Sequence, residues 1–425
     1  MATERVELEI EALGAGGDGI ARDAEGPIYV PFTLPGERVL AALGGRRGEG
    51  RTAAPIEVLR AAPERITPAC RHFGVCGGCA LQHQNRAAYL DWKRDLVVTA
   101  LTRRGLSDVE VAACIATPPA SRRRVRLRAV HGDGGVRLGL NRRRSHEVVA
   151  LQECPVLRPA LAALLAPLRR FLPQVLPRRA RAEVQLTETE AGVDLWIAAA
   201  APLRLATREA LTGFAEAHDL ARLSWGGAEL ETVVRRRPAA HRFGPALVEP
   251  PPTSFLQASA LAEAEIVSEV CQAAARAARI ADLFAGAGTL SLPLAASAAV
   301  TAIDADAAAL DALATAARHS AGLKPLTVER RDLFRRPLIA AELAGFDAVV
   351  IDPPRAGARA QAQLLAASDV ACVIAVSCDP ASFARDARIL VDGGHRLERV
   401  TPIDQFLWSP EVELVACFRK RTRRG

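Results

Sequence analysis

The sequence predicts a multi-domain protein with an N-terminal five-stranded OB-like β-barrel, a central α/β domain and a C-terminal Rossmann-like α/β domain. Three observations predict this arrangement. The chain has 425 residues, which suggests roughly three domains at about 150 residues each. Apolar and charged residues alternate near the N-terminus, whereas apolar strands alternate with helical stretches in the last part of the chain. We expect the domains to span 1–62, 63–250 and 251–425.

The first 60 residues predict a small all-β unit. Val6, Leu8 and Ile10 alternate with glutamates, as in a strand that buries one face. A glycine cluster at 14–19 predicts a turn. Small barrels of this kind often bind oligonucleotides, although a packing module without a ligand also fits the pattern. Further short strands are predicted near 28–30, 38–43 and 56–59.

The central region combines a cysteine-bearing loop, a helix and arginine-rich strands. An amphipathic helix is predicted over 89–104, after the loop. Arg124, Arg126 and Arg128 alternate with apolar residues before a glycine-rich turn, which predicts a hairpin with arginines on one face. The whole chain carries 55 Lys and Arg against 48 Asp and Glu. This clustering favours a surface that follows an RNA backbone, although a single arginine run is usually a solvated face.

The C-terminal region predicts a mainly parallel sheet covered by helices on both faces, with ligands at the carboxyl ends of its strands. The last two strands have no helix between them and are predicted to pair as a hairpin. Residues 283–303 are long and uncharged enough to span a bilayer, but their glycines and proline favour a strand, loop, helix and strand, so no membrane partner is expected. The strands are predicted near 280–284, 300–304, 326–329, 348–351, 373–376, 397–403 and 412–418.

A glycine loop at 286–289 follows the first of these strands and predicts a nucleoside cofactor. Glycines there let the backbone approach a ligand closely, and Asp304 at the end of the next strand is suited to accept both ribose hydroxyls. NAD usually requires a third glycine where Ser291 stands, so S-adenosylmethionine (SAM) is favoured. Asp332, after the third strand, is suited to bind the adenine, or is a surface acid.

Cys378 follows the fifth strand and is a candidate nucleophile rather than a packing residue. Carbon 5 of uracil is barely nucleophilic, so its methylation requires a thiolate to add to carbon 6 and a base to remove the carbon-5 proton afterwards. Glu413 is the candidate base. Asp352 begins an Asp-Pro-Pro turn that amine methyltransferases also use, but Arg355 stands where they carry an aromatic residue.

Four further cysteines have metal-binding spacing. Three lie in one loop with five and two intervening residues, and the fourth follows some 75 residues later. Four thiolates suit a tetrahedral zinc ion or an iron–sulfur cluster, and the spacing alone does not distinguish them. Nine cysteines in total, behind an N-terminus too acidic for a signal peptide, favour a cytoplasmic protein. The four candidate ligands are Cys70, Cys76, Cys79 and Cys154.

Together these motifs resemble the RNA uracil carbon-5 methyltransferase family over essentially the whole chain. The resemblance rests on the strings at 352–357 and 378–380, the glycine loop and Glu413. Segments 16–21 and 34–37 resemble the TRAM domain of that family. The resemblance implies that Cys378 is the nucleophile and Glu413 the base. It implies SAM contacts at Gln257, Phe284, Thr289, Asp304, Asp332 and Asp352.

The barrel and the four cysteines resemble the branch of the family that acts on 23S ribosomal RNA. This branch implies a [4Fe-4S] cluster in preference to zinc, and we expect a monomeric enzyme that forms 5-methyluridine in that RNA. A tRNA substrate, an amine-directed nucleic-acid methyltransferase and a non-catalytic RNA-binding protein are the alternatives. The chain departs from the family at Glu411, where a histidine is common, and Glu411 is expected to raise the pKa of Glu413 if both are buried.

Overall fold

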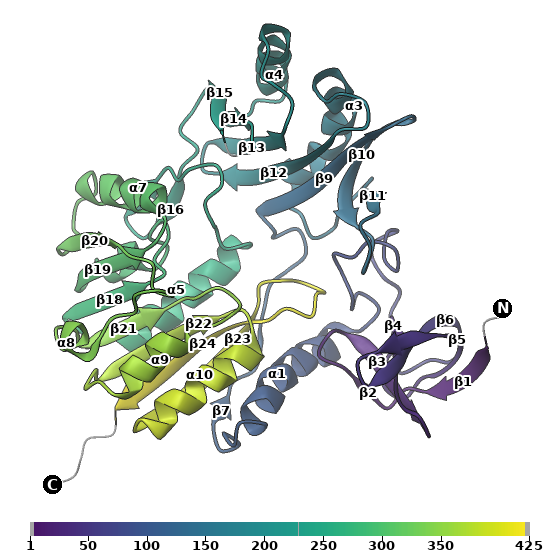
Figure 1. Cartoon of the computed structure of the whole chain (residues 1–425), viewed down its shortest axis with the longest axis horizontal. Helices are drawn as coiled ribbons and strands as arrows, with labels where there is room; N and C mark the ends of the chain where they lie inside the picture. The colour runs from purple at the N-terminus through teal and green to yellow at the C-terminus, as the bar shows by residue number, and fades with distance from the viewer. Residues whose placement is uncertain (1–3, 228, 421–425) are drawn as a thin grey trace.

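Three main sheets divide the protein, as the computed structural model of residues 4–227 and 229–420 shows (Figure 1). The N-terminal sheet has six strands, the central sheet seven and the C-terminal sheet nine. A separate two-stranded hairpin, β16 (His241–Phe243) and β17 (Ala246–Val248), packs beside the C-terminal sheet against helix α7. The division of the chain at residues 62 and 250 stays a prediction.

The N-terminal sheet has one strand more than predicted. Its order is β1-β5-β6-β4-β3-β2, and its two edge strands are neighbours in sequence, so the sheet curls back on itself. The glycine cluster does not end strand pairing, because β3 begins inside it. A Cβ on Gly19 would lie 2.1 Å from the Thr33 hydroxyl oxygen, so glycine permits this close approach. The strands are β1 (Arg5–Glu9), β2 (Ala12–Leu13), β3 (Asp18–Asp23), β4 (Gly26–Pro31), β5 (Arg38–Arg47) and β6 (Gly50–Arg60).

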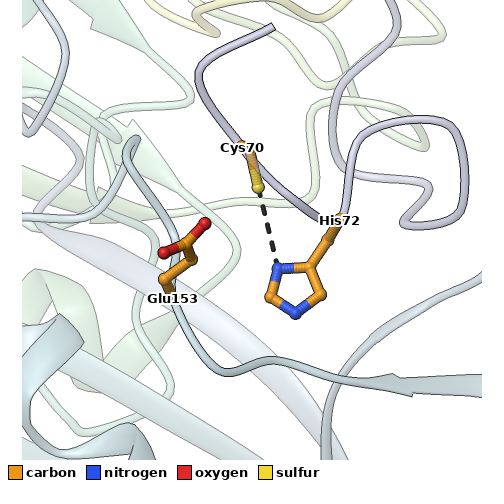
Figure 2. A group of neighbouring side chains, drawn as sticks. All are labelled: Cys70, His72 and Glu153. Atoms are coloured by element: carbon orange, nitrogen blue, oxygen red, sulfur yellow. Dashed lines mark hydrogen bonds between the residues drawn. The ribbon is translucent and has the colours of Figure 1, made fainter.

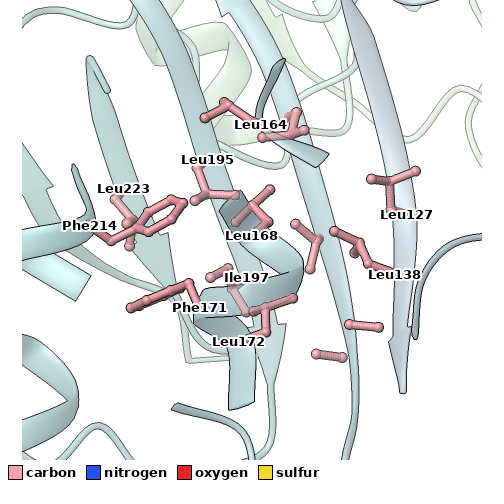
Figure 3. Close-up of a cluster of buried hydrophobic side chains, with 14 of the residues drawn as sticks. Leu127, Leu138, Leu164, Leu168, Phe171, Leu172, Leu195, Ile197, Phe214 and Leu223 are labelled. Carbon is pink, nitrogen blue, oxygen red and sulfur yellow. The ribbon is translucent and has the colours of Figure 1, made fainter. Parts of the chain in front are cut away.

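The central sheet buries only one of its two faces under helices. Leucines, isoleucines and phenylalanines from the sheet and from α3 and α4 form its core (Figure 3). The predicted arginine hairpin is confirmed as β9 and β10. The elements are β9 (Arg124–Gly132), β10 (Gly135–Asn141), β11 (Val148–Ala150), α2 (Pro159–Ala163), α3 (Leu165–Val175), β12 (Arg181–Thr189), β13 (Gly192–Ala199), α4 (Leu205–Ala217), β14 (Arg222–Trp225) and β15 (Glu231–Arg235).

The C-terminal sheet is mainly parallel, as predicted, with the order β20-β19-β18-β21-β22-β24-β23-β7. Helices α5, α6 and α7 cover one face, and α1, α8, α9 and α10 cover the other. The elements are α5 (Ala260–Ala274), β18 (Arg279–Leu283), α6 (Ser291–Leu294), β19 (Ala299–Asp304), α7 (Ala307–Arg318), β20 (Leu326–Arg330), α8 (Ala340–Leu343), β21 (Ala348–Ile351), α9 (Arg359–Ala366), β22 (Cys372–Ser377), α10 (Pro380–Asp392), β23 (His395–Asp404) and β24 (Glu413–Lys420).

Part of the predicted central region packs with the C-terminal sheet instead. Helix α1 (Arg86–Thr102) lies beside α10 and β23 (Figure 1). The short strands β7 (Glu110–Val111) and β8 (Ile115–Ala116) pair with β23. Helix α1 therefore reaches the segment that joins the last two strands.

The uncharged run at 283–303 forms the end of β18, a loop, α6 and most of β19. Within the described part of the chain, no helix is both long and apolar enough to cross a membrane.

Candidate active site and cysteine site

A cavity of about 580 Å³ opens at the carboxyl ends of the parallel strands. Loops after β18 to β22 contribute to it, because parallel strands present their carboxyl ends at one edge. The cavity brings together every residue predicted from the sequence to bind SAM or to act on uracil: Gln257, Phe284, Thr289, Asp304, Asp332, Asp352, Cys378 and Glu413.

The glycine loop turns sharply between β18 and α6. Phe284, Gly286 and Gly288 all have positive φ angles, of 64°, 54° and 92°. The Gly286 N–H donates to Asp304 Oδ2 at 2.9 Å, so the loop and the end of β19 are joined. A Cβ at Gly288 would lie 2.4 Å from a methyl carbon of Leu313, so a larger residue there would displace helix α7 or the loop.

Two carboxyl groups that have no basic partner among the described residues border the cavity. Asp282 is 1% exposed, and its Oδ1 has no hydrogen-bond partner. Burial raises the pKa of Asp282 to about 7, and the neighbouring Asp352 and Asp304 carboxylates add to the effect. Burial also raises the pKa of Asp352 to about 7. Such carboxylates favour a positively charged ligand, and SAM carries both an ammonium and a sulfonium charge, so the residues present fit this cofactor.

Cys378 and Glu413 face the same cavity from neighbouring strands. Burial raises the pKa of the Cys378 thiol to about 11; Glu413 adds to this, while the charge of Arg355 opposes it. Glu413 is 3% exposed, and burial, followed by the Asp352 charge, raises its pKa well above the usual range. The cavity therefore contains both a thiol and a buried carboxyl group.

Gln405 connects the two sides of the site, although its role is not evident from the sequence. Its Nε2 donates to Gln257 Oε1 at 2.7 Å and to Glu413 Oε2 at 2.8 Å. Gln257 Nε2 in turn lies 3.5 Å from Asp352 Oδ2. The hydrogen-bond chain therefore orients both the base candidate and one buried acid.

Glu411 and Arg355, the two residues that depart from the expected patterns, form an ion pair with each other at 2.5 Å. The Glu411 side chain is partly exposed and already paired. It raises the pKa of Glu413 less than burial and Asp352 do, and the Arg355 charge lowers that pKa.

Three aromatic residues of the cavity were not predicted. Phe334 lies opposite Phe284, with ring centroids 5.3 Å apart. Phe255 and Phe406 line both this cavity and an adjoining one of about 240 Å³. Phe255 is 65% exposed, and an exposed aromatic side chain at a cavity mouth is a signal that only the structure provides.

The adjoining cavity continues onto the open face of the central sheet. Arg124 and Arg126 line it, and both donate to Gln185 Oε1. Arg128 lies on the same face, because alternate residues of β9 share a side, and it lines two further cavities. A row of basic side chains therefore leads from the central sheet to the mouth of the cavity.

The four candidate cluster cysteines also lie close together. Burial, with a smaller effect from each of the other three, raises the pKa of Cys79 to about 12. The backbone of Cys76 forms an isolated β-bridge with that of Arg142, directly after β10, and Cys154 follows β11. Within the described residues, no three of the four sulfurs lie within 4.8 Å of one another. The four thiols suit either a zinc ion or an iron–sulfur cluster.

His72 and Glu153 accompany Cys70 at the edge of this site (Figure 2). The His72 Nδ1 lies 3.7 Å from the Cys70 sulfur, and a Glu153 carboxylate oxygen completes a group within 4.8 Å. Glu153 also accepts from the Arg71 N–H at 3.2 Å. Neither residue is evident as a ligand from the sequence, since only the fold brings Glu153 next to the loop.

Comparisons with known proteins agree with this site. A family model described as tRNA (Uracil-5-)-methyltransferase matches residues 248–421. An uncharacterized RNA methyltransferase of Brucella suis is 48% identical over 414 residues, which cover 97% of this chain and 98% of that protein. A Halomonas elongata protein named 23S rRNA (uracil(1939)-C(5))-methyltransferase RlmD is 35% identical, covering 96% of this chain and 88% of the relative. The chain belongs to the RNA (uracil-5-)-methyltransferase family.

A solved structure shows that this methyltransferase shares its fold along the whole chain. The tRNA (uracil-54, C5)-methyltransferase of Pyrococcus abyssi, in complex with S-adenosyl-L-homocysteine, matches with a TM-score of 0.77. The match covers 97% of this chain and 99% of that one at 23% identity. The fold is therefore a multi-domain form of the class I SAM-dependent methyltransferase fold with a curled N-terminal sheet.

Proposed function

We propose that this methyltransferase forms 5-methyluridine in 23S ribosomal RNA. The observation that carries the proposal is the shared cavity, where the Cys378 thiol and the Glu413 carboxyl group meet the glycine loop. A nucleophilic thiol is needed for carbon 5 of uracil and not for an exocyclic amine. The ribosomal substrate is favoured over tRNA by the similarity to the Halomonas relative, which is named for that activity.

In the proposed mechanism the Cys378 thiol first loses its proton to water. The resulting thiolate then adds to carbon 6 of the uracil. With a pKa of about 11, only about one part in 10⁴ of the thiol is ionised at neutral pH. The positive charge of Arg355 lowers the pKa of Cys378 and so favours the thiolate. Addition makes carbon 5 nucleophilic, and SAM supplies the methyl group from its sulfonium.

Glu413 then removes the proton from carbon 5, and the bond between carbon 6 and the Cys378 sulfur breaks. The proton ends on the Glu413 carboxyl group and the electron pair returns to sulfur, which balances the reaction. Burial makes the Glu413 carboxylate a stronger base, and the Gln405 amide holds its Oε2 at 2.8 Å. Gln257, Asp304, Asp332 and Asp352, with Phe284 and Thr289, are proposed to hold SAM.

Two substitutions test this mechanism. We expect Cys378→Ala to abolish methyl transfer to RNA, whereas Cys271→Ala, which removes a half-buried thiol of α5, retains it. We expect Glu413→Gln to slow turnover by about 10²–10⁴-fold and to accumulate a covalent RNA adduct on a denaturing gel. Full activity of Cys378→Ala would instead favour the amine-directed alternative that uses the Asp-Pro-Pro turn.

The RNA substrate has its own test. Mass mapping of 23S ribosomal RNA and tRNA from a deletion strain should show one missing methyl group on the ribosomal RNA. A methyl group missing only from tRNA would establish the tRNA alternative.

Cys70, Cys76, Cys79 and Cys154 are proposed to hold a [4Fe-4S] cluster. The all-thiol donor set suits such a cluster, and the resemblance to the 23S ribosomal RNA branch of the family favours it over zinc. When bound, the cluster would join the cysteine loop to the segment after β11. Chelation of the iron should therefore lower the midpoint of thermal unfolding. Anaerobic purification should yield a brown, iron-containing protein; colourless protein with one zinc per chain would contradict the assignment.

The remaining parts are proposed to bind the RNA. The curled N-terminal sheet is proposed to be a TRAM domain, and the row formed by Arg124, Arg126 and Arg128 to contact phosphates leading toward the cavity. Asp18 of β3 ties the two units together, because it accepts from Arg47 and from Arg144 and forms an ion pair with Arg143, both of the latter beside β10. We propose a monomer that acts in the cytoplasm, where free thiols stay reduced.

A further inference from the structure

The segment 404–412, which joins β23 to β24, carries much of the proposed active site. Gln405 hydrogen-bonds to Glu413, Phe406 lines the cavity, and Glu411 pairs with Arg355. Residues 405–412 lie outside both strands, so no sheet hydrogen bonds determine their path. Other contacts must therefore hold this segment if the base is to keep one position.

Helix α1 supplies these contacts from below the segment. Tyr89 and Lys93 are four residues apart and thus share one face of the helix. The Tyr89 hydroxyl donates to Asp404 Oδ1 at 2.7 Å and accepts from the Trp408 N–H at 2.8 Å. Figure 1 shows α1 alongside β23, with the yellow segment extending past it toward the centre of the molecule.

Lys93 donates all of its N–H groups to the same segment. An ammonium group has three N–H donors. Those of Lys93 reach Asp404 Oδ1, the Phe406 carbonyl at 3.1 Å and the Glu411 carbonyl. The side chain is 0% exposed. A buried ammonium is unfavourable unless it is paired and hydrogen-bonded, so its position indicates a specific use.

The cysteine loop holds the same segment from another side. The N–H groups of Ala80 and Leu81, directly after Cys79, both donate to the Trp408 carbonyl, at 2.8 and 3.1 Å. Trp408 has a φ angle of 59°, which a non-glycine residue seldom adopts without such support. Residues far apart in sequence therefore converge on one short connection.

We propose that Tyr89 and Lys93 are positioning residues that hold segment 404–412, and through it Gln405 and Phe406, in the arrangement that lets Glu413 act as the base. The proposal rests on the proposed function, because it concerns the step that Glu413 performs. Neither Tyr89 nor Lys93 lines the cavity in the described structure, so both act through the segment. Loosening the segment slows proton removal more than it weakens SAM binding, since most of the proposed SAM contacts lie on other elements and only Gln257 is held by Gln405.

Tyr89→Phe tests the proposal with the loss of a single hydroxyl group. Hydrogen exchange of the peptide covering 404–412 should speed up by about tenfold, because the Trp408 N–H loses its acceptor. The kcat for RNA methylation should fall by about tenfold, and the KM for SAM should change by much less. A longer-lived covalent adduct should appear on a denaturing gel, because the base acts in the elimination step.

Ser368→Ala is the matched control. The Ser368 hydroxyl is also buried, donates to the Leu365 carbonyl and accepts from the Val370 N–H, but it lies before β22, at the opposite end from Cys378. This variant should leave kcat and exchange of 404–412 unchanged. Lys93→Met should reproduce the Tyr89→Phe phenotype more strongly, by about 10²-fold in kcat.

Unchanged exchange in Tyr89→Phe would overturn the proposal, and so would faster exchange with an unaltered kcat. If Lys93→Met does not fold, the Tyr89→Phe variant alone decides the test. The exchange measurement needs no RNA, so it separates this proposal from the proposed function. If the wild-type protein methylated no uridine, the proposed function would fail, whatever the exchange of the segment.

Discussion

Asp282, Asp352 and Glu413 place three carboxyl groups around one cavity, beside the Cys378 thiol, and those of Asp282 and Glu413 are buried. Among the described residues, neither Asp282 nor Asp352 forms an ion pair with a basic side chain, and burial raises the pKa of each to about 7. A cationic ligand is the missing partner for such groups. The carboxylates of Asp282 and Asp352 are unfavourable without a nearby positive charge, so they favour SAM over a neutral or anionic cofactor.

These pKa values predict a pH dependence of SAM binding. The ionised carboxylates attract the cation, so affinity should be constant above about pH 7 and fall below it. The affinity for SAM should fall by at most about tenfold per pH unit for each carboxyl group involved. Calorimetric titration across this range is the measurement. Asp282→Asn should weaken binding at high pH and reduce the slope; an unaltered slope would exclude Asp282 as the titrating group.

At the scale of elements, the turn between β18 and α6 determines whether the cavity forms. Gly286 and Gly288 both have positive φ angles, but their surroundings differ. An added Cβ at Gly286 would meet no atom within 4 Å, whereas one at Gly288 would collide with Leu313 of α7. Only the second glycine is required by packing as well as by backbone conformation.

The two alanine variants should therefore differ. Gly286→Ala should cost about 1 kcal/mol from its backbone conformation alone. Gly288→Ala should cost roughly 1–3 kcal/mol more, because the buried leucine has to move. Thermal unfolding of both variants gives the comparison, and SAM affinity should fall further in Gly288→Ala. Equal midpoints would mean that α7 accommodates the added methyl group without strain.

At the scale of the whole molecule, the central sheet is asymmetric. One face carries the apolar core with α3 and α4, and the other presents arginines next to the cavity mouth. The Arg126 guanidinium also lies 5.3 Å from the Trp196 ring. Trp196 itself is buried, whereas the Phe255 ring, 5.8 Å from the Arg124 guanidinium, is exposed. Basic groups beside an exposed aromatic ring suit an RNA strand, which offers phosphates and bases together.

This arrangement predicts how RNA binding depends on salt. Arg126→Gln and Arg128→Gln should each weaken binding and lower the slope of log affinity against log salt concentration by roughly one. Arg178→Gln is the control, because Arg178 is an exposed arginine paired with Asp133 at the tip of the β9–β10 hairpin. Filter binding over a range of salt concentrations measures the slopes. Identical slopes for all three variants would contradict a phosphate-binding role for this face.

The sequence predicted the strands of the C-terminal sheet and the site residues at their ends. Both predictions rest on local signals, since an apolar strand followed by glycine, Asp-Pro or Cys-Asp marks the carboxyl edge of a parallel sheet. The N-terminal strand number was wrong. The additional strand, β2, has only two residues and pairs with β3 across the predicted glycine turn, where the Gly17 N–H donates to the Gly14 carbonyl. Two residues are too few for an alternating pattern to mark a strand.

The sequence by itself determined the type of each unit and its chemistry-bearing residues, because periodicity and turn residues act over a few neighbouring positions. Only the tertiary structure decided that α1 belongs with the C-terminal sheet and that Tyr89 and Lys93 reach the segment before Glu413. It also decided that Gln405 joins Gln257 to Glu413. Those contacts join residues up to about 300 positions apart, and their geometry follows from packing, which no local pattern encodes.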